Sequence, residues 1–251
     1  MNQPPPVPPE PTTSGTPPTL PEGGPPARSR RVAPIIAAIA AVGVGALIAV
    51  PLLKLNSDKG ADAALKAGWK RVAPSGEGFS LGLPPGWNSV STRSADDAFN
   101  SLQSANPELA NLVKDQLGAS LSSLIKLLAF DIQSPTLQQR FATNLNVVVA
   151  PTGSGVSFDA FLEANIDQLR RTPGLGNTLR SEKISLPAGQ AAKITSQLTV
   201  NSAGGQQTVA ITQFLLVNEA RGYIVSFSTL PSHVGSYSGL FQEIADTFRF
   251  A

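Results

Sequence analysis

The sequence predicts an α+β fold in which an antiparallel β-sheet is flanked by helices, preceded by one transmembrane helix and a disordered tail. Three observations predict it. One long apolar run lies near the start of the chain, later segments alternate apolar and polar residues, and others repeat apolar residues every three or four positions. Strands and helices do not follow the regular rhythm of parallel βαβ units, so we expect the sheet to be antiparallel.

Residues 1–31 are predicted to form a disordered Pro-rich cytoplasmic tail. Residues 1–27 hold 11 of the 22 prolines and no aromatic residue. A segment of this composition cannot bury enough apolar surface to offset the entropy of ordering, so we expect polyproline II character. Two interpretations stay open: a solvated extension of the anchor, or a ligand for an aromatic groove of a partner protein.

Residues 32–53 form the apolar run and contain no charged residue. At ~1.5 Å per residue, a helix of this length spans roughly 33 Å, about the hydrocarbon thickness of a bilayer. Arg28, Arg30 and Arg31 precede the run and two lysines follow it, so the positive-inside bias keeps the N-terminus cytoplasmic. We therefore expect a signal anchor in the cell membrane and an extracytoplasmic C-terminal domain, with a cleaved signal peptide as the alternative.

Small residues recur at every fourth position along this predicted helix. They would form one ridge on which a second helix can approach closely, which predicts self-association or a partner contact through the membrane helix. The alternative is that the segment is simply rich in alanine. The ridge consists of Ala33, Ala37, Ala41, Gly45 and Ala49.

The formal net charge of +2 belongs to the membrane-flanking part of the chain. Four of the 19 basic and two of the 17 acidic residues precede Leu55, so 15 of each follow it. The neutral remainder lacks the basic stripe that phosphate contacts need, and nucleic acid is not an expected partner. We expect a linker over residues 54–66 and one exported domain over residues 67–251, long enough for a sizeable core.

In the first part of the exported domain, Phe79–Leu83 alternates apolar residues with Ser80 and Gly82, as in a half-buried strand. A helical stripe follows. Where this predicted helix ends is open, because residues 125–132 at the end of the stripe fit a β-strand equally well. The stripe consists of Leu109, Leu112, Val113, Leu117, Leu121, Leu124 and Leu128.

A further strand is expected over Leu145–Val149, where apolar residues alternate with asparagine. Ser157 then has the character of a helix N-cap, because its hydroxyl can accept a hydrogen bond from a free backbone N–H of the first turn. The helix that follows has one apolar face, made of Phe158, Phe161, Leu162, Ile166 and Leu169.

The C-terminal third predicts an antiparallel meander. Its strands are expected over residues 192–200, about 208–217 and 223–229, separated by turns at 203–205 and 218–222. A final helix is indicated by a stripe at helical spacing: Tyr237, Leu240, Phe241, Ile244, Ala245 and Phe248.

Several of these segments together resemble the Mog1/PsbP-like superfamily. That resemblance implies an α/β/α sandwich and a non-catalytic role, because its members include photosystem II accessory subunits, a partner of the Ran GTPase and actinobacterial envelope lipoproteins. The chain departs from the lipoproteins in having a predicted membrane helix in place of a lipidated cysteine. The segments are GFSLGLPPGW (78–87), NLNVVVAP (144–151), FDAFLEANIDQLR (158–170), GYIVSFST (222–229) and FQEIADTFRF (241–250).

Residues able to carry chemistry are few. His233 is the only histidine and lies in a predicted turn, so we expect a solvated loop residue rather than the base of a hydrolase triad. The chain has no cysteine and no carboxylates clustered at ligand spacing, so no catalytic residue, metal site or cofactor is predicted. Glu163 and Asp167 lie one helical turn apart beside Arg170 and Arg171, and we interpret them as part of a solvated charged face.

Three other patterns have competing interpretations. Gly153-Ser154-Gly155 lies between a strand and a helix, as a nucleotide-binding loop would, but Phe158 stands where the dinucleotide fingerprint needs glycine. Asp96 and Asp97 are typical of the first turn of a helix. Four aromatic residues fill the core or line a ligand cleft: Trp69, Trp87, Tyr223 and Tyr237.

The sequence therefore predicts a non-enzymatic, membrane-anchored bacterial envelope protein whose exported domain binds or assembles with an envelope protein. A carrier or sensor of a small apolar ligand, such as a lipid, is the alternative and would require a deep apolar pocket. A hydrolase would require His233 to converge with an acid and a serine. A filled core with an exposed hydrophobic patch would favour the protein partner.

Overall fold

The computed structural model describes residues 65–91, 125–139, 141–175, 178–202 and 205–251. Its elements in chain order are β1 (Lys70–Val72), β2 (Phe79–Leu83), β3 (Trp87–Ser91), β4 (Ile125–Asp131), η1 (Pro135–Gln139), β5 (Asn144–Pro151), α3 (Phe158–Arg170), β6 (Arg180–Leu186), β7 (Gly189–Ser202), β8 (Gly205–Asn218), β9 (Arg221–Thr229), η2 (Pro231–His233), α4 (Val234–Asp246) and β10 (Arg249–Phe250).

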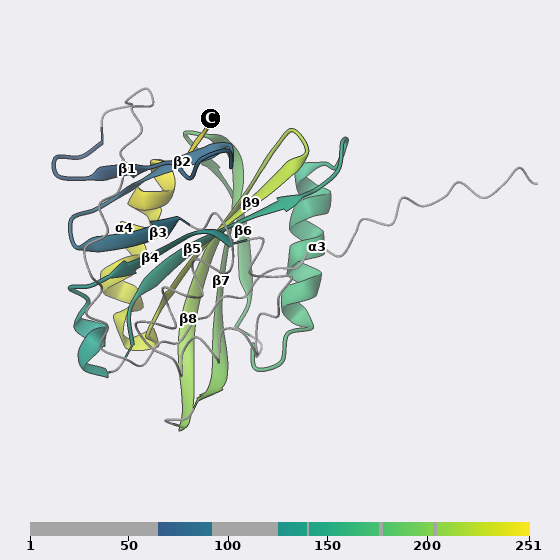
Figure 1. The fold of residues 1–251 in the computed structure, drawn as a ribbon. Helices are drawn as coiled ribbons and strands as arrows, with labels where there is room; N and C mark the ends of the chain where they lie inside the picture. Colours follow the sequence, from purple (N-terminus) through teal and green to yellow (C-terminus); the bar gives the residue numbers. More distant parts are fainter. Residues whose placement is uncertain (1–64, 92–124, 140, 176–177, 203–204) are drawn as a thin grey trace, which may run out of the picture. The chain divides into compact units, whose positions relative to one another are not determined.

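The described strands form two sheets. The larger has the order β3-β4-β5-β9-β8-β7-β6, and the smaller has the order β1-β2-β10 (Figure 1). Each neighbouring pair is antiparallel. The predicted antiparallel sheet is therefore confirmed, and so is the meander, because β7, β8 and β9 are neighbours in chain order.

The two helices lie on opposite sides of the larger sheet (Figure 1). On one face, Phe161 and Leu169 of α3 pack in a cluster with Ile224 of β9. On the other face, Phe241 of α4 and Phe79 of β2 belong to a second cluster, so the smaller sheet helps α4 to cover that side. The larger sheet thus has a core on each face.

The burial of β5 follows from this layering. Every residue of β5 except Pro151 is buried. Because successive side chains of a strand point to opposite faces, complete burial requires a layer on each side. The sequence pattern located this strand correctly.

The prediction that β2 is half-buried is wrong, because Ser80 and Gly82 are buried as well. β2 lies between β1 and β10, and its polar side is covered. The Gly82 N–H donates to Thr247 Oγ1 at 2.7 Å, and a Cβ on Gly82 would lie 2.6 Å from Leu65 Cδ2. A larger residue at this position would therefore require the Leu65 side chain to move.

Residues 125–131 form a strand, so of the two interpretations the strand is correct. Leu128 belongs to β4 and pairs with Asn146 of β5, and its place in a helical stripe was wrong. An isolated short apolar run does not distinguish a strand from a helix by periodicity alone. The rest of that stripe and the helix predicted at Asp96-Asp97 lie outside the described residues.

The two helices that were predicted in the C-terminal half of the chain are both present. Ser157 caps α3 as expected, since its Oγ accepts the Ala160 N–H at 3.2 Å. The last member of the predicted α4 stripe, Phe248, lies beyond the helix, which ends at Asp246. Phe248 stays buried because it stacks on Phe79 of β2 with ring centroids 5.6 Å apart.

The Pro-rich tail, Arg28, Arg30, Arg31, the apolar run and its ridge all lie outside the described residues. The helices in the described part of the chain are too short or too polar to cross a membrane.

Candidate functional site

Buried hydroxyl groups gather at one end of the larger sheet. They come from separate stretches of the chain: the segment around η1, the start of β5, the end of β9 and the first turns of α4. All are 5% exposed or less. We call this set the hydroxyl cluster: Ser134, Thr136, Thr143, Thr229 and Tyr237.

Thr143 is the centre of the hydroxyl cluster. Its Oγ1 lies 3.0 Å from Ser134 Oγ, 3.2 Å from Thr136 Oγ1 and 3.0 Å from Thr229 Oγ1. Ser134 Oγ and Thr136 Oγ1 are 2.6 Å apart, and Thr136 donates to the Phe141 carbonyl at 2.6 Å. A satisfied polar network in a low-dielectric interior fixes the groups that it joins, so this end of the sheet is rigid.

Tyr237 connects the cluster to the surface. Its hydroxyl donates to Asp131 Oδ2 at 2.7 Å and lies 2.8 Å from Ser134 Oγ. A hydrogen bond to a carboxylate is stronger than one between neutral groups. Burial raises the pKa of Tyr237 to about 12, with a further increase from Asp131 and an opposing effect of the Ser134 hydrogen bond. The phenol is therefore a neutral donor at ordinary pH, suited to holding α4 against β4.

Two large apolar side chains are exposed in the described part of the chain, Ile132 (44%) and Val234 (37%). Ile132 follows Asp131 directly, and Val234 lies about one helical turn before Tyr237. The Asp131–Tyr237 hydrogen bond thus joins β4, which ends one residue before Ile132, to α4, which begins with Val234. We call Ile132 and Val234 the apolar pair.

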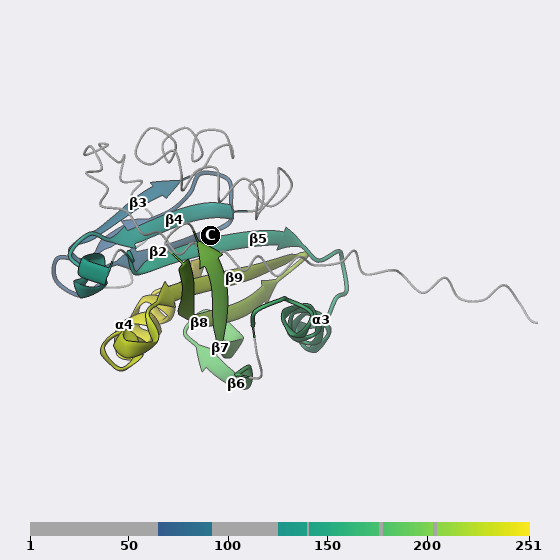
Figure 2. The same cartoon turned by 90° about the horizontal axis from the view of Figure 1, so that it is seen from below.

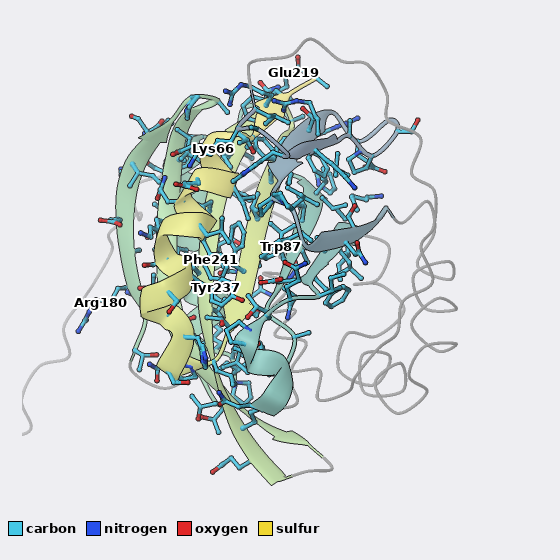
Figure 3. All side chains as sticks on the ribbon, turned by 90° about the vertical axis from the view of Figure 1, so that its left-hand side faces the viewer. Lys66, Trp87, Arg180, Glu219, Tyr237 and Phe241 are labelled. Carbon is cyan, nitrogen blue, oxygen red and sulfur yellow. The ribbon has the colours of Figure 1, made fainter. Side chains whose placement is uncertain are left out.

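Below the surface, this end is filled. Figure 3 shows Tyr237 and Phe241 on α4 with Trp87 across from them. Tyr237 and Phe241 have ring centroids 5.5 Å apart, and Phe241 stacks on Phe227 of β9 at 4.5 Å. The interior beside Tyr237, one helical turn after Val234, is therefore packed and hydrogen-bonded.

His233 lies beside this end, immediately before α4. Its Nδ1 is 3.0 Å from the Oγ of Ser232, its neighbour in the chain. The carboxylate of Asp131 accepts hydrogen bonds from Tyr237 and from the Gln133 N–H at 2.9 Å. The serine, histidine and acid are therefore not arranged as a hydrogen-bonded series.

Two cavities are lined by charged groups. One, of about 220 Å³, includes Arg71 and Arg249. Their guanidinium groups donate to the Thr247 carbonyl at 3.3 Å and the Asp246 carbonyl at 2.8 Å, so they satisfy carbonyls at the end of α4. The second, of about 430 Å³, lies over β6 and β7 and includes Arg180. Neither is the deep apolar pocket that a lipid carrier would need.

The remaining sequence-predicted residues have structural positions. Trp87, Tyr223 and Tyr237 are buried in the core, as one of the two interpretations expected. Trp69 is half-buried, with the Lys66 ammonium 5.8 Å from its ring centroid. All four pack in or against the core cluster on the α4 face, and none of them lines either of the two cavities described above.

The structure also shows where the charged and glycine-rich patterns of the sequence lie. Glu163 is exposed, and Asp167 forms an exposed ion pair with Arg170 at 3.3 Å, which confirms the solvated charged face. Gly153 and Gly155 have φ values of +79° and +84° and are exposed turn residues. Within the described ranges, no three His, Cys, Asp or Glu side chains come together as a metal site would require.

Sequence reasoning missed the hydroxyl cluster and the apolar pair. The threonines stand singly, Thr136 in η1 and the other two at the ends of strands, where no periodicity marks them. Thr143 directly precedes β5, and Thr229 ends β9. The register that pairs Asn144 with Ser228 brings these two ends together, and that register is a long-range property of the fold.

No protein-family model and no curated protein sequence matches the chain. The similar solved structures include cyanobacterial PsbP (CyanoP) from Synechocystis, with 13% identity, a TM-score of 0.45 and coverage of 77% of this chain and 98% of that one. They also include LpqN of Mycobacterium tuberculosis, described as involved in cell envelope biogenesis (11% identity, TM-score 0.43, coverage 73% and 90%). A variant of Mog1 has 13% identity, a TM-score of 0.40 and coverage of 72% and 95%.

PsbP, Mog1 and an envelope protein are thus among the structural neighbours, as the resemblance in sequence led us to expect. At these identities the similarity concerns the fold alone, and function has to be inferred from the residues of this chain.

Proposed function

We propose that this chain is a non-enzymatic envelope protein, tethered by the span predicted at residues 32–53, whose exported Mog1/PsbP-like domain binds a partner protein. The binding surface is the end of the domain that carries Ile132 and Val234. The tether rests on the length of the apolar run and on the arginines that precede it.

The apolar pair on its rigid base carries this proposal. A protein interface gains most from a few apolar anchors held in place before binding, because less side-chain and loop entropy is then lost. The Tyr237–Asp131 hydrogen bond joins α4 to β4, and the hydroxyl cluster connects Tyr237 through Ser134 and Thr143 to Thr229 at the end of β9. Gln133 follows Ile132 in the chain and Ser232 lies two residues before Val234, and these polar residues would supply a hydrogen-bonding rim.

The chemistry at this end supports binding better than catalysis. The Tyr237 phenol is neutral, with a pKa of about 12, and it donates to Asp131. His233 is hydrogen-bonded to its neighbouring serine, and the Asp131 carboxylate accepts from Tyr237 and Gln133. A general base near neutral pH that reaches a nucleophile is what a hydrolase would need.

The test is site-specific photo-crosslinking of the full chain in native membranes. A photoreactive residue at Ile132 or Val234 should give a protein adduct of one defined mass, whereas one at exposed Ser154 should not. The double variant Ile132→Asp/Val234→Asp should lower co-purification of that protein at least about tenfold, the loss of a single strong anchor being enough for this. Ser154→Asp is the matched control and should leave it unchanged.

Three outcomes would overturn the proposal. Equal crosslinking from Ser154, or retention of the adduct protein by the double variant, would place the interface elsewhere. Recovery of a lipid in place of a protein would favour the carrier.

A further inference from the structure

β6 is an edge strand, and in the described part of the chain it pairs with β7 alone. It lies at the end of the row of strands (Figure 2). From Arg180 to Ser185 no side chain is buried, and only Leu186 is. A strand of this length with a free edge presents backbone N–H and C=O groups that can pair with another strand.

The connection between β6 and β7 shows which groups face outward. Leu186 and Gly189 are partners separated by only two residues, so they must be a pair that exchanges backbone hydrogen bonds. Antiparallel pairs alternate between bonded and non-bonded positions, so Glu182 also faces β7. Ser181 and Lys183, between the bonded positions, therefore direct their backbone groups away from the sheet.

The charges next to Ser181 are self-complementary. Arg180 and Glu182 flank it on one face of the sheet, where they line the groove of about 430 Å³ together with Lys193 and Thr195. If two β6 strands pair antiparallel with Ser181 opposite Ser181, then Arg180 of each copy faces Glu182 of the other. Opposite charges directly across a strand pair are stabilising.

We propose that β6 is a self-association surface: a second copy of this chain pairs with it, antiparallel, about a two-fold axis at Ser181. The larger sheets of the two copies then continue into each other, and Lys183 pairs with Leu179 on each side of the axis. This surface is separate from both the predicted membrane-helix ridge and the apolar pair.

Charge disfavours the neighbouring register. Pairing centred on Lys183 would place two lysines directly opposite each other, which is destabilising. Lys183 also forms an ion pair with Asp159 at 2.8 Å, which directs its side chain toward α3. Centring on Ser181 avoids the like-charge contact.

The symmetry also suits two tethered copies. A two-fold axis that relates antiparallel strands of one sheet runs perpendicular to the sheet, so α4 lies on the same side in both copies. Lys66 contacts Glu243 of α4 at 2.6 Å, so the start of the described chain lies on that side too. The described parts of both copies would therefore begin on the same side of the joined sheet, as two copies held by the proposed tether require.

The pairing should be weak in dilute solution, since exposed ion pairs contribute little individually. Tethering two copies to one surface raises their effective concentration and favours the pair without any new contact. The association should therefore be measured with the full chain in its membrane.

The chain has no cysteine, so a single introduced thiol reports contacts without background. Facing Cα atoms of a hydrogen-bonded antiparallel pair are about 5.5 Å apart, within disulfide range. Ser181→Cys in the full, membrane-inserted chain should therefore give a disulfide-linked dimer on mild oxidation. Ser185→Cys is the matched control, because the two copies of residue 185 would lie roughly 26 Å apart along the strands.

Charge exchange sharpens the test. In the Ser181→Cys background, Arg180→Glu should lower the dimer yield several-fold, because two glutamates then face each other, and Glu182→Arg should do the same. The combination Arg180→Glu/Glu182→Arg should restore the yield. Equal crosslinking at residues 181 and 185, no crosslink at 181, or indifference to charge reversal would overturn the proposal, whatever the partner experiment at Ile132 shows.

Discussion

The two faces of the larger sheet are filled by different means. On the α4 face, aromatic rings contact one another in directed pairs: Phe227 stacks on Phe241 at 4.5 Å, and Phe214 meets Phe227 edge-on at 5.9 Å. The hydroxyl cluster adds hydrogen bonds to the same side. The α3 face is mainly aliphatic, with Leu169 of α3 packed in a cluster with side chains from β7, β8 and β9.

Because of this difference, the orientation of α4 is fixed more precisely than that of α3. Ring pairs and hydrogen bonds have preferred geometries, so α4 has one orientation that satisfies them. Aliphatic packing depends mainly on shape and volume and tolerates exchange of similar side chains. Val234, on α4, and the Tyr237–Asp131 hydrogen bond both belong to the more precisely held helix.

The largest expected effect tests the aromatic face. Phe227→Ala should lower the free energy of unfolding by about 3–5 kcal/mol, because it removes a fully buried ring and leaves a cavity. Urea unfolding followed by tryptophan fluorescence measures the loss. A double-mutant cycle with Phe241→Ala should give a coupling of about 0.5–1.5 kcal/mol for the stacked pair, and a coupling of zero would remove the distinction between the faces.

Tyr237→Phe tests the hydrogen bonds of the same face. It should cost about 1–3 kcal/mol, since Asp131 loses a donor and Ser134 a partner. The folded-state pKa of Tyr237, about 12, lies above the ordinary value of 10.0, so its contribution is complete below pH 10 and is lost as pH rises toward 12. The stability difference between wild type and variant should therefore shrink over that interval. A constant difference would show that the phenol does not titrate as described.

Asn165→Leu tests the α3 face, and here the substitution is expected to stabilise the protein. Asn165 is 1% exposed, and its Nδ2 donates to the Phe161 carbonyl at 2.8 Å. Its Oδ1 has no hydrogen-bond partner within the described residues, and an unsatisfied buried acceptor is costly. An apolar side chain of similar size should raise the free energy of unfolding by about 1–2 kcal/mol in the same urea assay. Destabilisation instead would show that this face is as specific as the other.

Ser157→Ala should have the smallest effect, a loss of about 1 kcal/mol, because only the N-cap hydrogen bond to Ala160 is removed. Thermal unfolding with Ser157→Asp as a control checks it, since aspartate also caps helices well. If Asp lowered the melting temperature as much as Ala, the cap would not be the cause.

Local patterns predicted the parts of the fold that have local causes. Alternation located β5 and the β7–β9 meander, and the cap at Ser157 located α3. β6 was missed because its exposed sequence, RSEKISL, alternates no apolar residues until its end. The short strands β1 and β10 were missed because pairing with β2, rather than their own sequence, makes them strands.

The candidate site was even less accessible from sequence. His233 lies near the candidate site, because it directly precedes α4, but its predicted role as a solvated loop residue did not identify that site. The hydroxyl cluster depends on the register between β5 and β9, and Asp131 was assigned to an ambiguous segment. A buried polar network joins residues far apart in the chain, so neither the spacing of residues nor the composition of the sequence predicts it.

The pairing of β5 with β9 has a consequence for how the chain folds. These strands occupy the middle of the larger sheet, yet residues 152–220 separate them in the chain. Early and late residues also meet at the smaller sheet, where Ser80 pairs with Arg249. Contacts between residues far apart in the sequence require large loops to close. The entropy of loop closure is lost before these contacts contribute stability, and folding is therefore slow. A chain emerging during synthesis must therefore remain largely without its central strand pair until β9 is available.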